Sequence, residues 1–251
     1  EKAYLLFVIR DSSGQEIRRF TKQPTKGLQR YYWDGRLANR SEVKEANSPL
    51  TNSGGAQLAK PGTYQVEIFL GHANRFDPLL DEAQPFELRW LKDHSFQIED
   101  PANLVAFQDS LEEARRRWNG VRDWHQRLLK RNGKLTALAR NTPGAPLSLL
   151  KDLQKVQEDL RKLKIEISGD ATRSKYNFES LPSLNSRIGS AVWNSYGSTA
   201  EPTGEQRKNL AWVQEATRRI GNQLEKLEGQ QDQYYQILLN NGSPVLDGEM
   251  R

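Results

Sequence analysis

The spacing of apolar residues along the chain changes once, near residue 100. Before that point apolar and polar side chains alternate in short runs, which is typical of strands that are buried on one face. After it apolar residues recur every three or four positions, which is typical of amphipathic helices. The pattern therefore predicts two domains, a β domain over residues 1–99 and a helical domain over residues 100–251.

Short strands separated by turn signals fill the β domain. Residues 3–10 are β-branched and aromatic, and a turn at residues 11–14 leads into a return strand over residues 15–21. Further strands are predicted over residues 28–33, 63–70 and about 84–98. Because several short strands with no helix between them must bury their apolar faces against each other, we expect a β-sandwich.

The stretch Leu28–Leu37 is central to this domain, because it places strand-forming aromatic residues directly before an Asp-Gly turn. We interpret it as the central strand and turn of the sandwich, with Trp33 and Tyr64 in the core. The same aromatic rings are a possible platform for a sugar. Tyr31, Tyr32 and Trp33 are therefore the candidate ligand-binding residues of the chain.

The helical domain contains four predicted helices, which begin near Pro101, Leu150, Leu181 and Thr203. The first has an expected weak point at Asn132-Gly133, and the last has a cap signal, since Gln206 follows Thr203 at capping-box spacing. The inward residues expected for the last two helices are Leu181, Leu184, Ile188, Val192 and Tyr196, then Leu210, Val213, Thr217, Ile220, Leu224, Leu227, Tyr234 and Leu238. Amphipathic helices with short connections predict an antiparallel four-helix bundle.

The order of three short motifs gives the β domain a family resemblance. These motifs are Asp11-x-x-Gly14-x-x-Ile17-Arg18-Arg19, Gly27-Leu28-x-Arg30-x-x-Trp33-Asp34-Gly35-Arg36 and Pro61-Gly62-Thr63-Tyr64-x-Val66. Together they resemble the immunoglobulin-like domain related to that of flagellar hook-capping proteins. Bacterial secreted proteins carry this domain after a β-propeller of BNR or sortilin-like repeats. The chain departs from the pattern over residues 38–60 and 71–85, where we expect enlarged loops.

The helical domain is similar to the helical segment that follows the immunoglobulin-like domain in the same proteins. The likeness lies in a leucine-rich seam and in the helix start Pro202-Thr203-x-x-Gln206. That family is often described as glycosyl-hydrolase-like because of its propeller repeats, and none of these repeats is present in this sequence. Since Glu1 lies next to a predicted strand, we expect a piece of a longer chain, secreted or periplasmic, with a signal peptide upstream.

Composition and charge narrow the function classes. Cysteine is absent, which excludes disulfides and thiolate metal sites. No apolar run has the length of a membrane span, so membrane insertion is not expected. Residues 1–100 carry 14 basic and 14 acidic side chains and residues 101–251 carry 23 and 18, so the net charge of +5 arises in the helical domain. Because acids interleave with these bases, a solvated helical surface is favoured over nucleic-acid binding.

No catalytic motif, metal site or cofactor site is predicted. The chain lacks a glycine-rich phosphate loop, a His-Glu-x-x-His motif and a Gly-x-Ser-x-Gly motif. His72 and His94 flank strands, and His125 falls on the helical seam, where a packing role is favoured over metal ligation. A minor alternative is a calcium site made by Asp77, Asp81 and Glu82.

These observations favour a non-catalytic accessory or scaffold region of a secreted β-propeller protein, which contacts its own propeller or another protein. One alternative is a carbohydrate-binding module that uses Tyr31, Tyr32, Trp33 or the loop 38–60. Another is part of a glycoside hydrolase whose active site lies in a propeller outside this sequence. Nucleic-acid binding by the helical domain is the least favoured. The sequence alone does not decide whether the full protein is an enzyme.

Overall fold

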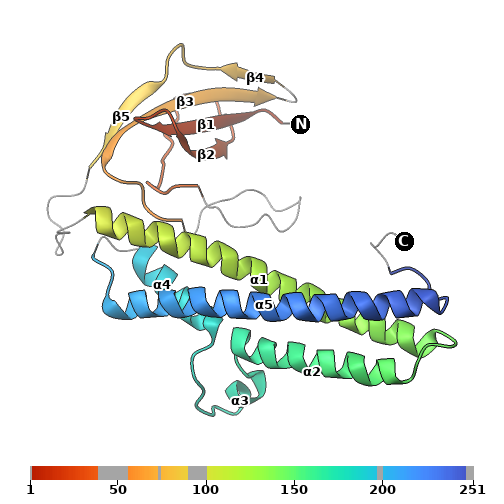
Figure 1. Cartoon of the computed structure of the whole chain (residues 1–251). Helices are drawn as coiled ribbons and strands as arrows, with labels where there is room; N and C mark the ends of the chain where they lie inside the picture. The colour runs from red at the N-terminus through yellow and green to blue at the C-terminus, as the bar shows by residue number, and fades with distance from the viewer. Residues whose placement is uncertain (1, 39–55, 73–74, 90–100, 197–199, 247–251) are drawn as a thin grey trace. The chain divides into compact units, whose positions relative to one another are not determined.

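The computed structural model describes residues 2–38, 56–72, 75–89, 101–196 and 200–246 (Figure 1). An antiparallel β-sheet comes first in the chain, and helices follow it. The chain divides into two compact units. The β unit comprises Glu1–Glu112 and Val192–Pro202, and the helical unit comprises Glu113–Ala191 and Thr203–Arg251.

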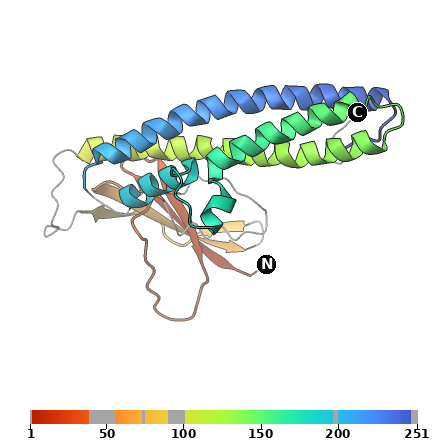
Figure 2. The same ribbon diagram turned by 90° about the horizontal axis from the view of Figure 1, so that it is seen from below.

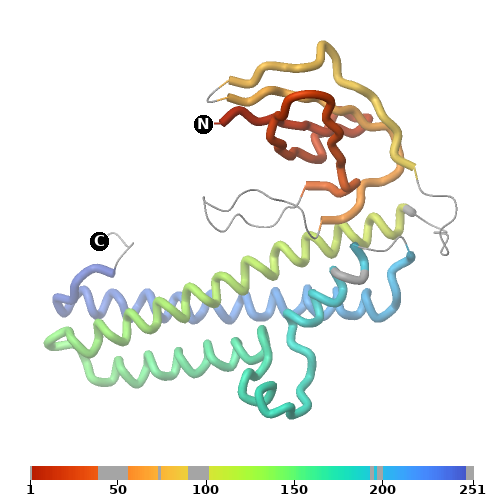
Figure 3. Tube along the Cα trace, turned by 180° about the vertical axis from the view of Figure 1, so that it is seen from behind, coloured from red at the N-terminus to blue at the C-terminus, as the bar shows by residue number. Residues whose placement is uncertain are grey.

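A single sheet of five antiparallel strands forms the framework of the β unit (Figure 1). The strands are β1 (Tyr4–Asp11), β2 (Glu16–Lys22), β3 (Gly62–His72), β4 (Arg75–Pro78) and β5 (Gln84–Leu88). Their order is β2-β1-β3-β4, and β5 also pairs with β3. The long strand β3 can hold both neighbours because β5 pairs with its first residues and β4 with its last (Figure 3).

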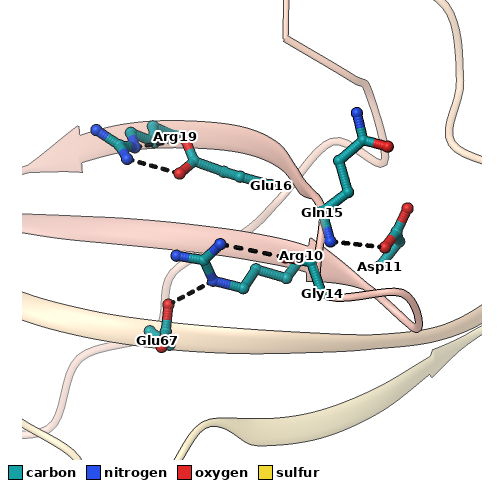
Figure 4. Close-up of polar contacts among 7 residues, drawn as sticks. All are labelled: Arg10, Asp11, Gly14, Gln15, Glu16, Arg19 and Glu67. Carbon is teal, nitrogen blue, oxygen red and sulfur yellow. Dashed lines mark hydrogen bonds and ion pairs between the residues drawn. The ribbon is translucent and has the colours of Figure 1, made fainter.

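The β1–β2 hairpin confirms the turn predicted at residues 11–14. One carboxylate oxygen of Asp11 accepts hydrogen bonds from the backbone N–H groups of Ser13 and Gln15, at 2.9 and 3.0 Å. Gly14 supplies a φ of 82°, which favours glycine. Arg10 pairs with Glu67 across β1 and β3 at 2.9 Å (Figure 4). This ion pair is partly exposed, so we expect it to contribute little to stability.

The stretch predicted as the central strand is not a strand. Residues 28–34 have no regular secondary structure, and just after them Arg36 forms one isolated β-bridge with Leu58. The indole Nε1 of Trp33 donates to the Arg36 carbonyl at 2.9 Å, and the Asp34 carboxylate accepts the Arg36 N–H at 3.1 Å. These local bonds and the packing of Trp33 outweigh the β propensity of the aromatic residues.

The second sheet of a sandwich is not confirmed. All the strands in the described ranges belong to one sheet, and its core consists of buried Ile9, Ala59 and Tyr64 with half-buried Trp33 and Phe86 around them. Non-strand residues thus contribute to covering this face of the sheet. Most of the expected loop 38–60 and the final strand residues Trp90, Phe96 and Ile98 lie outside the described residues. The expected loop 71–85 contains β4, which the sequence pattern did not predict.

The helices of the chain are α1 (Pro101–Asn141), α2 (Ser148–Ser168), α3 (Ala171–Lys175), α4 (Leu184–Tyr196) and α5 (Gly204–Asn240). α1 is continuous through Asn132-Gly133, so the expected weak point is wrong. The buried Asn132 side chain donates to the Leu153 carbonyl of α2 at 3.0 Å, which holds this part of α1 in the core. The short helix α3 was not predicted from the sequence.

Within the helical unit α2 and the first part of α4 follow one another along α1, while α5 runs beside both (Figures 1 and 2). Hydrogen bonds from α1 record this order: Trp118 Nε1 to Asn185 Oδ1 at 2.8 Å, His125 Nε2 with the Leu160 carbonyl at 2.8 Å, and Asn132 Nδ2 to the Leu153 carbonyl at 3.0 Å. Three long helices therefore surround the core where α2 lies. The four-helix bundle is not confirmed, because α2 and α4 lie one after the other along α1 and not side by side.

The apolar seam was predicted well for most of α5, with two errors. Ala216 and Tyr235 are buried at the places where Thr217 and Tyr234 were expected. Each error is a shift of one residue, toward the N-terminus at Ala216 and toward the C-terminus at Tyr235. A buried Gln231, with none of its surface exposed, also interrupts the apolar seam.

The capping box at the start of α5 is confirmed, and it allows a stability prediction. The Thr203 hydroxyl accepts the Gln206 N–H at 3.2 Å, and the Gln206 side chain accepts the Thr203 N–H at 2.7 Å. We expect Thr203→Ala to lower the free energy of unfolding by about 1 kcal/mol, because a helix N–H loses its partner. Urea denaturation checks this, with Thr203→Ser as the matched control. Equal stability of the alanine and serine variants would contradict the capping role.

Candidate functional site

The aromatic candidates Tyr31, Tyr32 and Trp33 do not form an exposed row. Trp33 is half-buried, and its ring lies edge-on to the rings of Tyr64 and Phe86, with centroids 5.7 and 5.8 Å away. Tyr31 is also half-buried. Tyr32 is 73% exposed and is the only open ring of the three. The exposed row of two or three rings that would favour a sugar platform is therefore absent from this described stretch, and Trp33 packs against the core of the sheet.

The pKa of the buried Tyr64 hydroxyl is raised, first by burial and then by the negative charge of Asp11. The neutral hydroxyl donates to the Lys60 carbonyl at 2.5 Å. The unfolded chain ionises near the ordinary pKa of about 10. The folded chain resists this ionisation, so stability is full below that pH and falls as the pH rises through it toward the raised value.

We therefore expect unfolding of the β unit to become easier between about pH 9 and about pH 11, and Tyr64→Phe to reduce this dependence. Urea midpoints measured across that range check the sign. Tyr234→Phe is the matched control, because Tyr234 has a raised pKa but lies in the helical unit. Identical pH profiles for the wild type and Tyr64→Phe would contradict the assignment.

The histidine and acidic candidates do not gather into a metal site. In the described part of the chain, no group of three or more His, Asp or Glu side chains could hold a metal ion, so Asp77, Asp81 and Glu82 do not form the calcium site considered above. His125 is buried, and its Nε2 makes a hydrogen bond with the Leu160 carbonyl, as expected for a packing role. His94 lies outside the described residues. None of the described helices has the length and apolar character needed to cross a membrane.

The site that the structure favours is a groove on the helical unit. It has a volume of about 400 Å³ and is lined by the end of α2, residues 181–183, the start of α4 and the middle of α5. Three large apolar side chains in its lining are exposed: Leu181 (85%), Trp212 (54%) and Ile165 (44%). Exposed apolar side chains that gather at one place typically mark a binding surface. We call this site the Trp212 groove.

Charged side chains also line the Trp212 groove. Arg219 of α5 forms a two-bond ion pair with Glu166 of α2. The Arg187 guanidinium of α4 lies over the Trp212 ring, 4.0 Å from its centroid, and its Nη1 donates to Asn209 Oδ1 at 3.0 Å. The ring and the amide fix the orientation of this guanidinium.

The groove was not predicted from the sequence, although part of its signal was present. Trp212 directly precedes the seam residue Val213, so it lies on the outer side of α5, where a large aromatic residue is unexpected. Leu181 was assigned to the inward face of a helix, but α4 begins only at Leu184. Apolar residues that fall off a helical seam were therefore the available signal.

No protein-family model, curated protein sequence or solved structure matches this chain.

Proposed function

We propose that the chain is a non-catalytic scaffold region that binds a protein partner through the Trp212 groove. The observation that carries this proposal is the grouping of Leu181, Trp212 and Ile165, all exposed, around one groove. Burial of such side chains against a partner is favourable, because apolar surface leaves water. Trp and Arg are also the residue types that most often dominate the binding energy of protein interfaces.

The chemistry of the groove supports binding more than catalysis. Arg219 is held by Glu166, and Arg187 is stacked on Trp212. A guanidinium is a permanent cation that holds an anionic group well but exchanges protons poorly. A carbohydrate-binding role at Tyr31, Tyr32 and Trp33 has less support, since only Tyr32 presents an open ring.

The wider setting is part of the same proposal. The immunoglobulin-like sandwich, the four-helix bundle and the link to a secreted or periplasmic β-propeller protein are supported by the motifs around Gly14, Trp33 and Tyr64 and by the cap at Thr203. In that setting the partner is the propeller of the same polypeptide or another exported protein. A glycoside hydrolase activity would then reside in the propeller.

Calorimetric titration tests the scaffold role. The chain is titrated with the propeller of its parent polypeptide, expressed separately, and the Trp212→Ala variant is titrated in parallel. We expect saturable binding that weakens at least about tenfold in the variant, as for a dominant interface residue. Tyr32→Ala is the control, because it removes an exposed ring from the β unit. Absence of binding by the wild-type chain would overturn the proposed contact with the propeller.

A further inference from the structure

We infer that the Trp212 groove recognises a peptide segment of its partner in which a carboxylate side chain lies beside apolar side chains. The carboxylate binds Arg187, and the apolar side chains cover Trp212 and Leu181. This inference depends on the proposed protein-binding function and adds the chemistry of the partner. It follows from the bonding of Arg187, the charges around it and the exposed apolar lining.

Arg187 has unused hydrogen-bonding capacity. A guanidinium has five N–H donors, and the structure gives one hydrogen bond to this side chain, from Nη1 to Asn209. Nε is buried and has no acceptor. Within the described ranges no carboxylate forms an ion pair with Arg187, although the guanidinium is half-buried and stacked on Trp212. A carboxylate from a partner would satisfy donors of a cation whose orientation is already fixed.

The other charges of the groove direct an anion to Arg187. Arg219 already has its counter-charge in Glu166. Its Nη1 and Nη2 each donate a hydrogen bond to one carboxylate oxygen of Glu166. Glu215 also lines the groove, but its side chain is exposed, so water and salt screen its repulsion. Arg187 is thus the cation of the groove that lacks a counter-charge among the described residues, and it is the more shielded from water.

The apolar lining indicates that apolar side chains of the partner lie next to its carboxylate. Leu181 and Trp212 are both more than half exposed, with 85% and 54% of their surface open. A lone anion would leave these surfaces in water, whereas a peptide with neighbouring aliphatic or aromatic side chains would cover them. A volume of about 400 Å³ is enough to accommodate a few side chains of a short peptide segment.

Selection of random nonapeptides displayed on phage, with the wild-type chain as bait, provides the probe. We expect the enriched peptides to contain Asp or Glu next to Leu, Ile, Phe or Trp, and to lose binding to Trp212→Ala. Enriched peptides that bind at the groove but carry no acid would overturn the inference and leave the proposed function intact. No peptide that depends on Trp212 would overturn both at this site.

Fluorescence polarisation with one enriched peptide then tests Arg187. We expect Arg187→Gln to weaken binding about 10- to 100-fold, the value of a charge-assisted hydrogen bond pair, with Arg187→Lys between the two. The same peptide with its acid replaced by the amide should show the same loss on the wild type and no further loss on Arg187→Gln. Glu215→Gln, a neutralised residue of the same groove, should not weaken binding. Circular dichroism confirms that each variant is folded.

Two further outcomes would also contradict the peptide inference. Sedimentation with vesicles of anionic phosphatidylglycerol that depends on Arg187 and Trp212, with no peptide binding, would assign the groove to a lipid surface. A dimer of the wild-type chain that becomes monomeric in Trp212→Ala, measured by light scattering, would assign it to a second copy. We expect the wild type to show neither behaviour.

Discussion

Replacement of Trp118 by Ala is expected to lower the free energy of unfolding of the helical unit by about 3–5 kcal/mol. Trp118 is 1% exposed, and its indole Nε1 donates to Asn185 Oδ1 at 2.8 Å. The variant creates a large cavity between α1 and α4 and leaves the Asn185 amide without this partner. Urea denaturation followed by far-ultraviolet circular dichroism measures the loss, because this signal comes mainly from the helices.

Two controls separate the contributions to this loss. Trp212→Ala removes a tryptophan of the same unit that is 54% exposed, so we expect a cost below about 1 kcal/mol. Asn185→Ala keeps the indole but removes this hydrogen bond, together with the bond from Asn185 Nδ2 to Ser168 Oγ at 3.4 Å, and should cost about 1–2 kcal/mol. Equal losses for the two tryptophan variants would show that Trp118 does not lie in the core.

The second large effect is expected in the β unit, where Ile9→Ala should cost about 2–5 kcal/mol. Ile9 is 2% exposed and packs with Ala59 and Tyr64 under the half-buried Trp33. The truncated side chain leaves a cavity beside Ala59, Tyr64 and Trp33. Amide hydrogen exchange measured by mass spectrometry locates the effect, with faster exchange expected in peptides from β1 and β3.

Arg19→Ala is the matched control for Ile9→Ala. Arg19 lies in the neighbouring strand β2, is exposed and pairs with Glu16 (Figure 4). Loss of such a surface pair costs at most about 1 kcal/mol. Exchange in β1 and β3 that rises equally in both variants would argue against a core centred on Ile9.

Elements fixed by local chemistry were predictable from the sequence. The hairpin at Asp11–Gly14 and the capping box at Thr203 depend on residues that are close in sequence, and both were predicted. The long helices were also predicted, because their apolar spacing persists over many turns. The strand after Pro61-Gly62 followed from strict alternation, and it forms most of β3.

Elements that depend on distant contacts were not predictable. A bulge in the β1–β2 ladder places Arg18 opposite Ile9, and half-buried Ile17 packs against the same core. Arg18 is 5% exposed and donates to the Leu37 carbonyl at 3.0 Å. The stretch Leu28–Trp33 has strong strand propensity, yet it has no regular secondary structure. Only the completed tertiary structure decides such cases.

The candidate site shows the same division. Tyr31, Tyr32 and Trp33 were predicted as ligand-binding residues because three aromatic residues are adjacent in the sequence. The groove depends instead on Leu181 and Arg187, before and within the start of α4, and on Trp212 of α5, and these two parts of the chain meet only after folding. Sequence patterns identify which residues of a helix face the core more readily than which exposed residues form a binding surface.

The buried polar residues His125, Asn132 and Gln231 have a mechanical consequence. Each bonds a carbonyl of a neighbouring helix, at 2.8, 3.0 and 3.0 Å respectively. A purely aliphatic interface could slip by a heptad, about 10 Å along the axis, and reform its contacts. Here a slip would break all three hydrogen bonds at once. A force applied along the helices is therefore resisted by the three bonds together. A scaffold that holds a partner under shear would gain from this resistance.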